Sequence, residues 1–209
     1  MERCCAVADG VSVPGANLLG EERLELFDLL SSGEADVAVG DLSRSFQRMK
    51  YVYFSSSYAT LYQSVIMNND DLKNWNVEKN PYKYLEQNEV KIGVESETAY
   101  AEFAQLDFPK ATILKYAAES DDWNDLPNHK IAAIFGDSNE MATIARKYPE
   151  IALKYSIYVF YDLKITKGIA ISPKNPNLVM IINSYLEMHD VIYTLEDMIH
   201  NYPDVYKCE

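Results

Sequence analysis

The stretch LLSSGEADVAVG, residues 29–40, decides the fold class of this chain. Its leucines complete an apolar helical pattern over 21–32, in which Phe27 and Leu30 stand three residues apart on one side. Gly33 is placed to stop this helix, because glycine takes the left-handed conformation of a helix C-terminus without strain. The run DVAV that follows predicts a short buried strand. A helix that leads into a buried strand is typical of α/β architecture.

Strands and helices continue to alternate along the chain in two blocks. A polar stretch over 69–88 separates them, and strand–helix pairs resume at Val90. Because each block has its own strands and helices, we expect two lobes. The predicted first lobe comprises 1–66 plus 170–209, and the second comprises 67–169.

The clearest helical pattern follows the last predicted strand, at about 165–172. The pair Asn175-Pro176 is a preferred helix start, with Asn175 as the N-cap and Pro176 in the first turn. Behind it, apolar residues recur at helical spacing and predict one buried face. This face is formed by Leu178, Ile181, Ile182, Tyr185 and Leu186.

Composition excludes several functional classes. With 209 residues, 48% hydrophobic and 24% charged, the chain has the composition of an ordinary globular protein. A formal net charge of −13 argues against nucleic acid and anionic membrane surfaces as partners, because both require clustered Lys and Arg. No apolar run approaches the roughly 20 residues of a membrane span. The three cysteines lie near the ends, with no histidine at a metal-ligand spacing, so we expect no metal site.

Three strand-to-helix junctions are candidate binding positions, since ligands of α/β proteins sit where strands end and helices begin. Arg48 closes the first junction and offers a planar fork for a carboxylate, with a solvated surface arginine as the alternative. Asp137 stands in the third junction, where it fits either a helix N-cap or the counter-ion of a ligand ammonium. Arg48 and Asp137 would lie on opposite lobes. Together they could hold a zwitterion, with Arg48 binding its carboxylate and Asp137 its ammonium.

Several segments, in order along the chain, carry a resemblance to a known family. They are LLSSGEADVAVGDLSRSFQR (29–48), VYFSSSY (52–58), KIGV with TAY (91–100), IAAIFGD (131–137), and KGIAI with PKNPNL (167–178). Together they resemble extracellular solute-binding protein family 3, the amino-acid-binding type of periplasmic protein. The resemblance implies a two-lobed α/β fold of the periplasmic-binding-protein type II, with a cleft between the lobes.

The resemblance also implies a role for each site position. Arg48 would form a bidentate pair with the ligand α-carboxylate, to which Ser43 and Thr98 would add donors. Asp41 would offer its backbone carbonyl to the ligand ammonium, and Asp137 would be the counter-ion of that ammonium. The predicted ligand-binding residues are Arg48, Asp137, Ser43, Asp41, Thr98 and Ala99.

The chain departs from the family pattern in two regions. The family's first strand, first helix and second strand have no counterpart, since Met1–Gly20 does not read as such a unit. We therefore expect an incomplete first lobe. At the second junction, Glu97 replaces the usual glycine before Thr98, and Ala99 lacks the second hydroxyl of the family.

The expected function is binding of a small polar solute, an amino acid in the first place, for ABC-type transport. An ABC-type permease would be the partner, and the resemblance implies a periplasmic or extracellular location, although no signal peptide is visible. No Ser-His-Asp or Cys-His arrangement is present, so we expect neither catalysis nor a cofactor. Two alternatives stay open: a sensory ligand-binding domain of a larger membrane protein, and a remnant that no longer binds a ligand.

Overall fold

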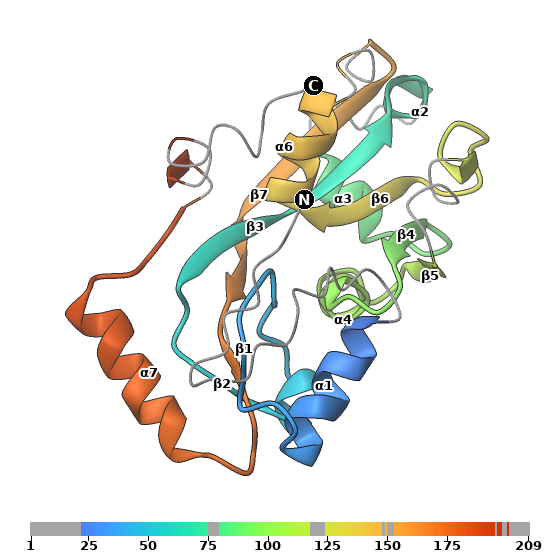
Figure 1. Cartoon of the computed structure of the whole chain (residues 1–209). Coiled ribbons are helices and arrows are strands. Elements are labelled where there is room, and N and C mark those ends of the chain that lie inside the picture. The colour runs from blue at the N-terminus through green and yellow to red at the C-terminus, as the bar shows by residue number, and fades with distance from the viewer. Residues whose placement is uncertain are drawn as a thin grey trace. The chain divides into compact units, whose positions relative to one another are not determined.

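The computed structural model describes residues 22–74, 80–117, 124–147, 149, 153–194, 196–197 and 200, and Figure 1 shows how the elements follow one another. Contacts divide the described chain into two compact units. Unit 1 contains the residues up to Leu61 and those from Ile165 onward, and unit 2 runs from Tyr62 to Lys164. The expectation of a missing first-lobe segment concerns Met1–Gly20, which lies outside the described residues. The division into two ligand-binding lobes stays a prediction.

Unit 1 is built on a three-stranded sheet in the order β1-β8-β2. Strand β8 (Ala170–Ile171) lies in the centre and pairs antiparallel with β1 (Val37–Ala38) and β2 (Tyr53–Phe54). The helices of this unit are α1 (Glu22–Ser32), the short 3₁₀-helix η1 (Arg48–Lys50) and α7 (Asn177–Met188). The sheet therefore joins segments from both ends of the described chain.

The predicted helix stop at Gly33 is confirmed. Helix α1 ends at Ser32, and Gly33 has a φ of 82°, in the left-handed region that favours glycine. The Leu29 carbonyl accepts hydrogen bonds from the amides of Gly33 and Ala35, which closes the helix. Behind this cap, the core of unit 1 packs apolar side chains of α1, the sheet and its loops: Leu30, Ala38, Leu42, Val52, Phe54 and Ala170.

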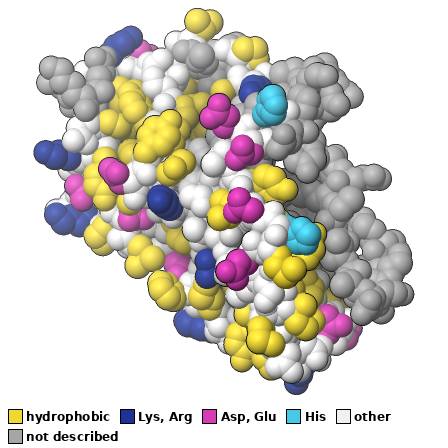
Figure 2. Space-filling model, turned by 90° about the vertical axis from the view of Figure 1, so that its left-hand side faces the viewer, with side chains coloured by type: hydrophobic (Ala, Val, Ile, Leu, Met, Phe, Trp, Pro, Cys, Tyr) yellow, Lys and Arg dark blue, Asp and Glu magenta, His cyan; other side chains and the backbone are white. Residues whose placement is uncertain are grey.

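The predicted buried face of α7 is only partly correct. Leu186 is buried, but Ile181 and Tyr185 leave 58% and 59% of their surface exposed. Figure 2 looks onto the side where α7 lies and shows hydrophobic side chains at the surface there. The apolar stripe of α7 is therefore covered only in part. Asn175 is not the N-cap of α7, because its side chain donates instead to the Asp36 carboxylate.

Unit 2 contains a five-stranded sheet in the order β5-β4-β6-β3-β7. Its strands are β3 (Ala59–Asn68), β4 (Lys91–Glu95), β5 (Thr112–Tyr116), β6 (Ala133–Asp137) and β7 (Tyr155–Lys167). Strand β4 is parallel to both β5 and β6, whereas β3 is antiparallel to β6. Strands β3 and β7 are also the two segments in which the chain passes between the units. The predicted strand at 165–172 is thus corrected to the end of β7 plus the separate β8.

The helices of unit 2 are α2 (Asn69–Asn74), α3 (Pro81–Leu85), α4 (Tyr100–Asp107) and α6 (Ser138–Lys147). Side chains of β6 alternate between two packing layers, as strand geometry requires. Ile134 belongs to a buried cluster with Met141 of α6. Phe135 faces the opposite way, with its ring centre 6.4 Å from that of Phe108 and 6.0 Å from that of Tyr100. The mixed strand and helix content confirms the predicted α/β class.

We expect Gly33→Ala to lower the free energy of unfolding by about 1–2 kcal/mol, the cost of a left-handed conformation for an L-residue. An added Cβ would also lie 2.8 Å from Cγ of Lys174. Gly40→Ala is the matched control, because a Cβ there meets no atom of the described residues within 4 Å. Urea unfolding followed by circular dichroism measures both variants, and equal stability of the two would contradict this account of the helix stop.

Candidate ligand-binding site

The first predicted junction forms a turn between β1 and η1 in unit 1. Ser45, which is 3% exposed, accepts a hydrogen bond at 3.3 Å from the amide of Arg48, the first residue of η1. Two backbone hydrogen bonds tie the turn to the end of β7: the Arg44 amide donates to the Thr166 carbonyl, and the Gly168 amide to the Leu42 carbonyl. The turn is therefore fixed against the end of β7 on both sides of Ser43.

The Arg48 side chain is fixed by its own turn. Its Nη1 donates to the Ser43 carbonyl at 3.0 Å, and its guanidinium carbon lies 5.1 Å from the ring centre of Phe27. The residue is half-buried. A guanidinium carries five N–H donors, which makes it suited to a planar carboxylate. Pairing of Arg48 with a ligand stays a prediction.

A buried lysine, which the sequence did not single out as a site residue, lies beside this turn. Lys167 is 2% exposed, and its Nζ lies 2.7 Å from Oδ1 of Asp41 and 3.0 Å from Oγ of Ser43. Asp41 was expected to contribute only its backbone carbonyl, yet its carboxylate pairs with this ammonium. The position before Gly168 lies inside a family-like segment, but nothing in the sequence indicates that its side chain is buried.

Tyr58 completes this polar cluster. Its hydroxyl donates to the Gly40 carbonyl, and its amide donates to the Lys167 carbonyl at 3.1 Å. Burial and, to a smaller extent, the Asp41 carboxylate raise the pKa of Tyr58 to about 12, although the Lys167 ammonium opposes the shift. The phenol therefore stays a hydrogen-bond donor at neutral pH.

In unit 2, Asp137 ends β6 and is completely buried. Its Oδ1 accepts hydrogen bonds from the amides of Asn139 and Glu140, at 3.0 and 2.9 Å, so the predicted capping of α6 is confirmed. Its Oδ2 accepts from the Tyr100 hydroxyl at 2.9 Å. These bonds fix the orientation of the carboxylate, while the second possibility, a ligand counter-ion, stays a prediction.

The second junction lies beside Asp137. The parallel pairing of Val94 with Phe135 brings the carboxyl ends of β4 and β6 together, which places Thr98 and Ala99 at the same edge of the sheet. The Thr98 hydroxyl donates to the Glu95 carbonyl at 2.7 Å and accepts from the Tyr100 amide at 3.2 Å. Ala99 is 5% exposed.

The turn before Thr98 contains a non-glycine residue in a conformation that suits glycine. Glu97 has a φ of 63°, in the left-handed region. This geometry explains why glycine is usual at the position, since an L-residue there carries strain.

The six predicted ligand-binding residues fall into two groups. Asp41, Ser43 and Arg48 share one turn of unit 1, while Thr98, Ala99 and Asp137 share one sheet edge of unit 2. Sequence reasoning missed Lys167 and gave no role to Tyr100, although Tyr100 follows directly on the Thr98-Ala99 pair. A single site formed by both groups stays a prediction.

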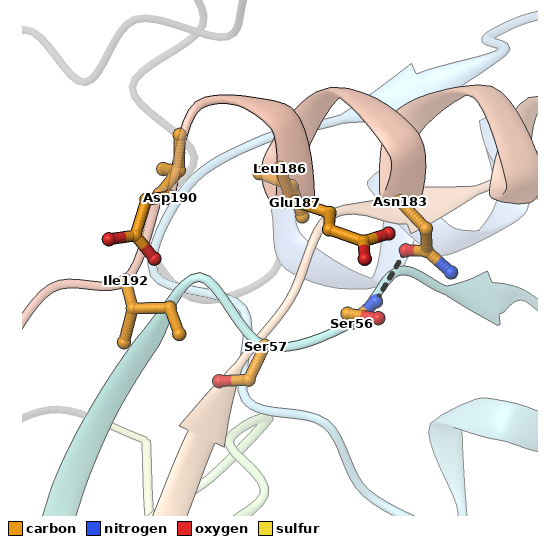
Figure 3. A pocket seen from close by; sticks show the side chains of 8 residues that line it. Ser56, Ser57, Asn183, Leu186, Glu187, Asp190 and Ile192 are labelled. Atoms are coloured by element: carbon orange, nitrogen blue, oxygen red, sulfur yellow. Dashed lines mark hydrogen bonds between the residues drawn. The ribbon is translucent and has the colours of Figure 1, made fainter.

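Unit 1 also contains a hollow that lies apart from the predicted residues. It has a volume of about 330 Å³ and lies between α7 and the segment that joins β2 to β3. Figure 3 shows the Ser56 amide donating to the Asn183 side chain, at 2.7 Å, with the carboxylates of Glu187 and Asp190 on the same rim. None of the six predicted ligand-binding residues lines it.

The described ranges hold no group of three or more His, Cys, Asp or Glu residues arranged to bind a metal ion. Cys4, Cys5 and Cys208 lie outside these ranges. No helix within the described part of the chain is both long and apolar enough to span a bilayer.

Comparison with known proteins gives the fold. No curated protein sequence matches the chain. An amino-acid ABC transporter substrate-binding protein of Streptococcus pneumoniae, bound to L-arginine, superposes with a TM-score of 0.64 at 16% identity, over 88% of this chain and 75% of that chain. An ancestral amino-acid-binding protein, described as a precursor of cyclohexadienyl dehydratase, gives 0.61 at 21% identity, over 87% and 72%.

A third solved structure with the same fold is the VFT2 domain of BvgS from Bordetella pertussis. It gives a TM-score of 0.61 at 20% identity, over 78% of this chain and 66% of that chain. These likenesses confirm the predicted two-lobed α/β fold. The family model for bacterial extracellular solute-binding proteins, family 3, matches residues 22–200, which include every predicted site residue. The chain belongs to family 3 of the bacterial extracellular solute-binding proteins.

Proposed function

We propose that this protein binds a free amino acid, without chemical turnover, through the carboxylate and ammonium of the ligand. The observation that carries the proposal is the fixed turn of unit 1. There, hydrogen bonds fix the Arg48 guanidinium and the Ser43 hydroxyl, the two groups that the family resemblance assigns to the ligand carboxylate. A guanidinium pairs well with a carboxylate because its N–H groups match the two oxygens.

Asp137 supports the ammonium end of the proposed ligand. It is a fully buried carboxylate whose orientation is set by two backbone amides and the Tyr100 hydroxyl. Thr98 and Ala99 lie at the same sheet edge and would line the site beside it. With the ligand removed from water, each charge pair would strengthen, and a ligand lacking either charge would be penalised.

The comparisons support two biological roles for this binding, transport and sensing. The Streptococcus pneumoniae relative is a component of an ABC transporter, which supports delivery of the ligand to an ABC-type permease from an extracellular or periplasmic location. The Bordetella pertussis relative is the VFT2 domain of BvgS, which supports the alternative, a ligand-binding domain of a larger sensory protein. We propose transport as the primary function, because both the family and the substrate-binding relative point to it.

We expect one class of amino acid to raise the melting temperature of the purified protein in a screen of the twenty standard L-amino acids. A ligand that binds only the folded state stabilises it by about 2.7 kcal/mol at a hundredfold excess over Kd. Nuclear magnetic resonance spectra of the ligand after incubation should show it chemically unchanged. A cooperatively folded protein that responds to none of the twenty would contradict amino-acid binding and favour the remnant that no longer binds.

We expect Arg48→Ala to weaken binding of that amino acid by about 2–5 kcal/mol, the usual cost of breaking a buried charge pair. Isothermal titration calorimetry measures the loss. Lys50→Ala is the matched control, because it removes a positive charge from an exposed residue of the same turn. Unfolding curves of both variants separate an effect on binding from an effect on the fold. Equal affinity of the two variants would exclude Arg48 from the site.

We expect Asp137→Asn to weaken amino acids at least tenfold more than the corresponding carboxylic acids without an amino group, because it removes the charge that pairs with the ammonium. Asparagine keeps an oxygen for the amides of Asn139 and Glu140. Tyr100→Phe removes one hydrogen bond to Asp137 but leaves its charge, so its effect should be smaller. A uniform loss across both ligand types would make Asp137 a helix cap only.

A further inference from the structure

Ser43 is held between two cationic side chains in unit 1. Arg48 donates through Nη1 to the Ser43 carbonyl, and Lys167 donates through Nζ to the Ser43 hydroxyl oxygen, each at 3.0 Å. Ser43 itself is only 4% exposed. Ser43 thus connects one cation of the turn, Arg48, with one cation of β7, Lys167.

The donor Lys167 sets the direction of the Ser43 hydroxyl. An ammonium group has three donors and no acceptor, so the oxygen of Ser43 can only accept from it. A hydroxyl has a single hydrogen, and that hydrogen must then point to a different acceptor. Donation from a charged group also polarises the hydroxyl and makes it a stronger donor in turn.

The position of Lys167 is strongly constrained. Its Nζ lies 2.7 Å from Oδ1 of Asp41, and its backbone forms an antiparallel bridge with Ser43. Its carbonyl accepts from the Tyr58 amide at 3.1 Å. A buried ammonium is tolerated only when paired and hydrogen-bonded, and the Asp41 carboxylate together with the Ser43 hydroxyl meets that requirement.

We propose that Lys167 is a positioning residue of the ligand-carboxylate site: by donating to Ser43, it fixes the Ser43 hydroxyl as a donor to the carboxylate of the bound amino acid. This inference rests on the proposed function and deepens it. Lys167 does not touch the ligand, and acts through Ser43.

A double-mutant cycle tests the inference. Isothermal titration calorimetry with each of the twenty standard L-amino acids that binds the wild type gives Kd for wild type, Lys167→Met, Ser43→Ala and the double variant. We expect Lys167→Met to weaken binding about tenfold when Ser43 is present, the size of one net hydrogen bond to a charged group, and less than twofold when Ser43 is already alanine. Equal losses in both backgrounds would overturn the inference.

Control variants separate this role from a general effect on stability or charge. Lys164→Met removes a positive charge from an exposed position of β7, and it should bind within twofold of wild type. Lys167→Arg keeps a donor-only head group and should restore most of the affinity lost in Lys167→Met. If Lys167→Met does not unfold cooperatively, Lys167→Leu takes its place, and binding by Lys167→Leu as tight as by Lys167→Arg would overturn the inference.

The wild-type measurement distinguishes failure of the proposed function from failure of the proposed role of Lys167. If no amino acid binds the wild type, the proposed function fails and the role of Lys167 fails with it. If the wild type binds and Arg48→Ala weakens it while the Lys167–Ser43 cycle is additive, only the role of Lys167 fails.

Discussion

The structure of unit 1 depends on the hydrogen bonds that β8 makes to β1 and β2. This strand has only two residues, yet it joins the N-terminal α1–β1 region to the C-terminal part of the chain. Closing such a long loop costs conformational entropy, which the few strand hydrogen bonds must offset together with the buried cluster around Leu30 and Phe54. The turn with Arg48 is anchored to the same C-terminal segment through Thr166 and Gly168. The order of the candidate site in unit 1 therefore depends on this long-range strand pairing.

Different contacts stabilise unit 2. Its sheet places β4 between two parallel neighbours, and the aromatic rings of Phe108 and Phe135 pack on one face of it. Asp137 can be fully buried there because three donors satisfy its oxygens: the amides of Asn139 and Glu140 and the Tyr100 hydroxyl. The same contacts that stabilise the start of α6 thus preorganise a carboxylate. Structural and binding roles of such a residue do not exclude each other.

Much of the fold could be predicted from the sequence, because local signals were strong. The helix stop at Gly33 follows from backbone freedom, and strand β1 follows from the apolar run that comes after it. The exposure of Ile181 and Tyr185 could not be predicted, since a helical pattern shows which residues share a face but not how much of that face a neighbour covers. The burial of Lys167 was equally hidden. A lysine is expected at the surface unless a partner for its charge can be identified. The partner of Lys167 is Asp41, which lies far from it in the sequence.

The exposed side of α7 has a chemical consequence. Met180 and Met188 leave 68% and 81% of their surface open, so their thioether sulfurs are accessible to peroxides and other oxidants. Conversion of these side chains to sulfoxides makes them polar and chiral without altering the buried Leu186. Oxidation of these two methionines would thus change the surface polarity of α7 and would not cause a loss of core packing.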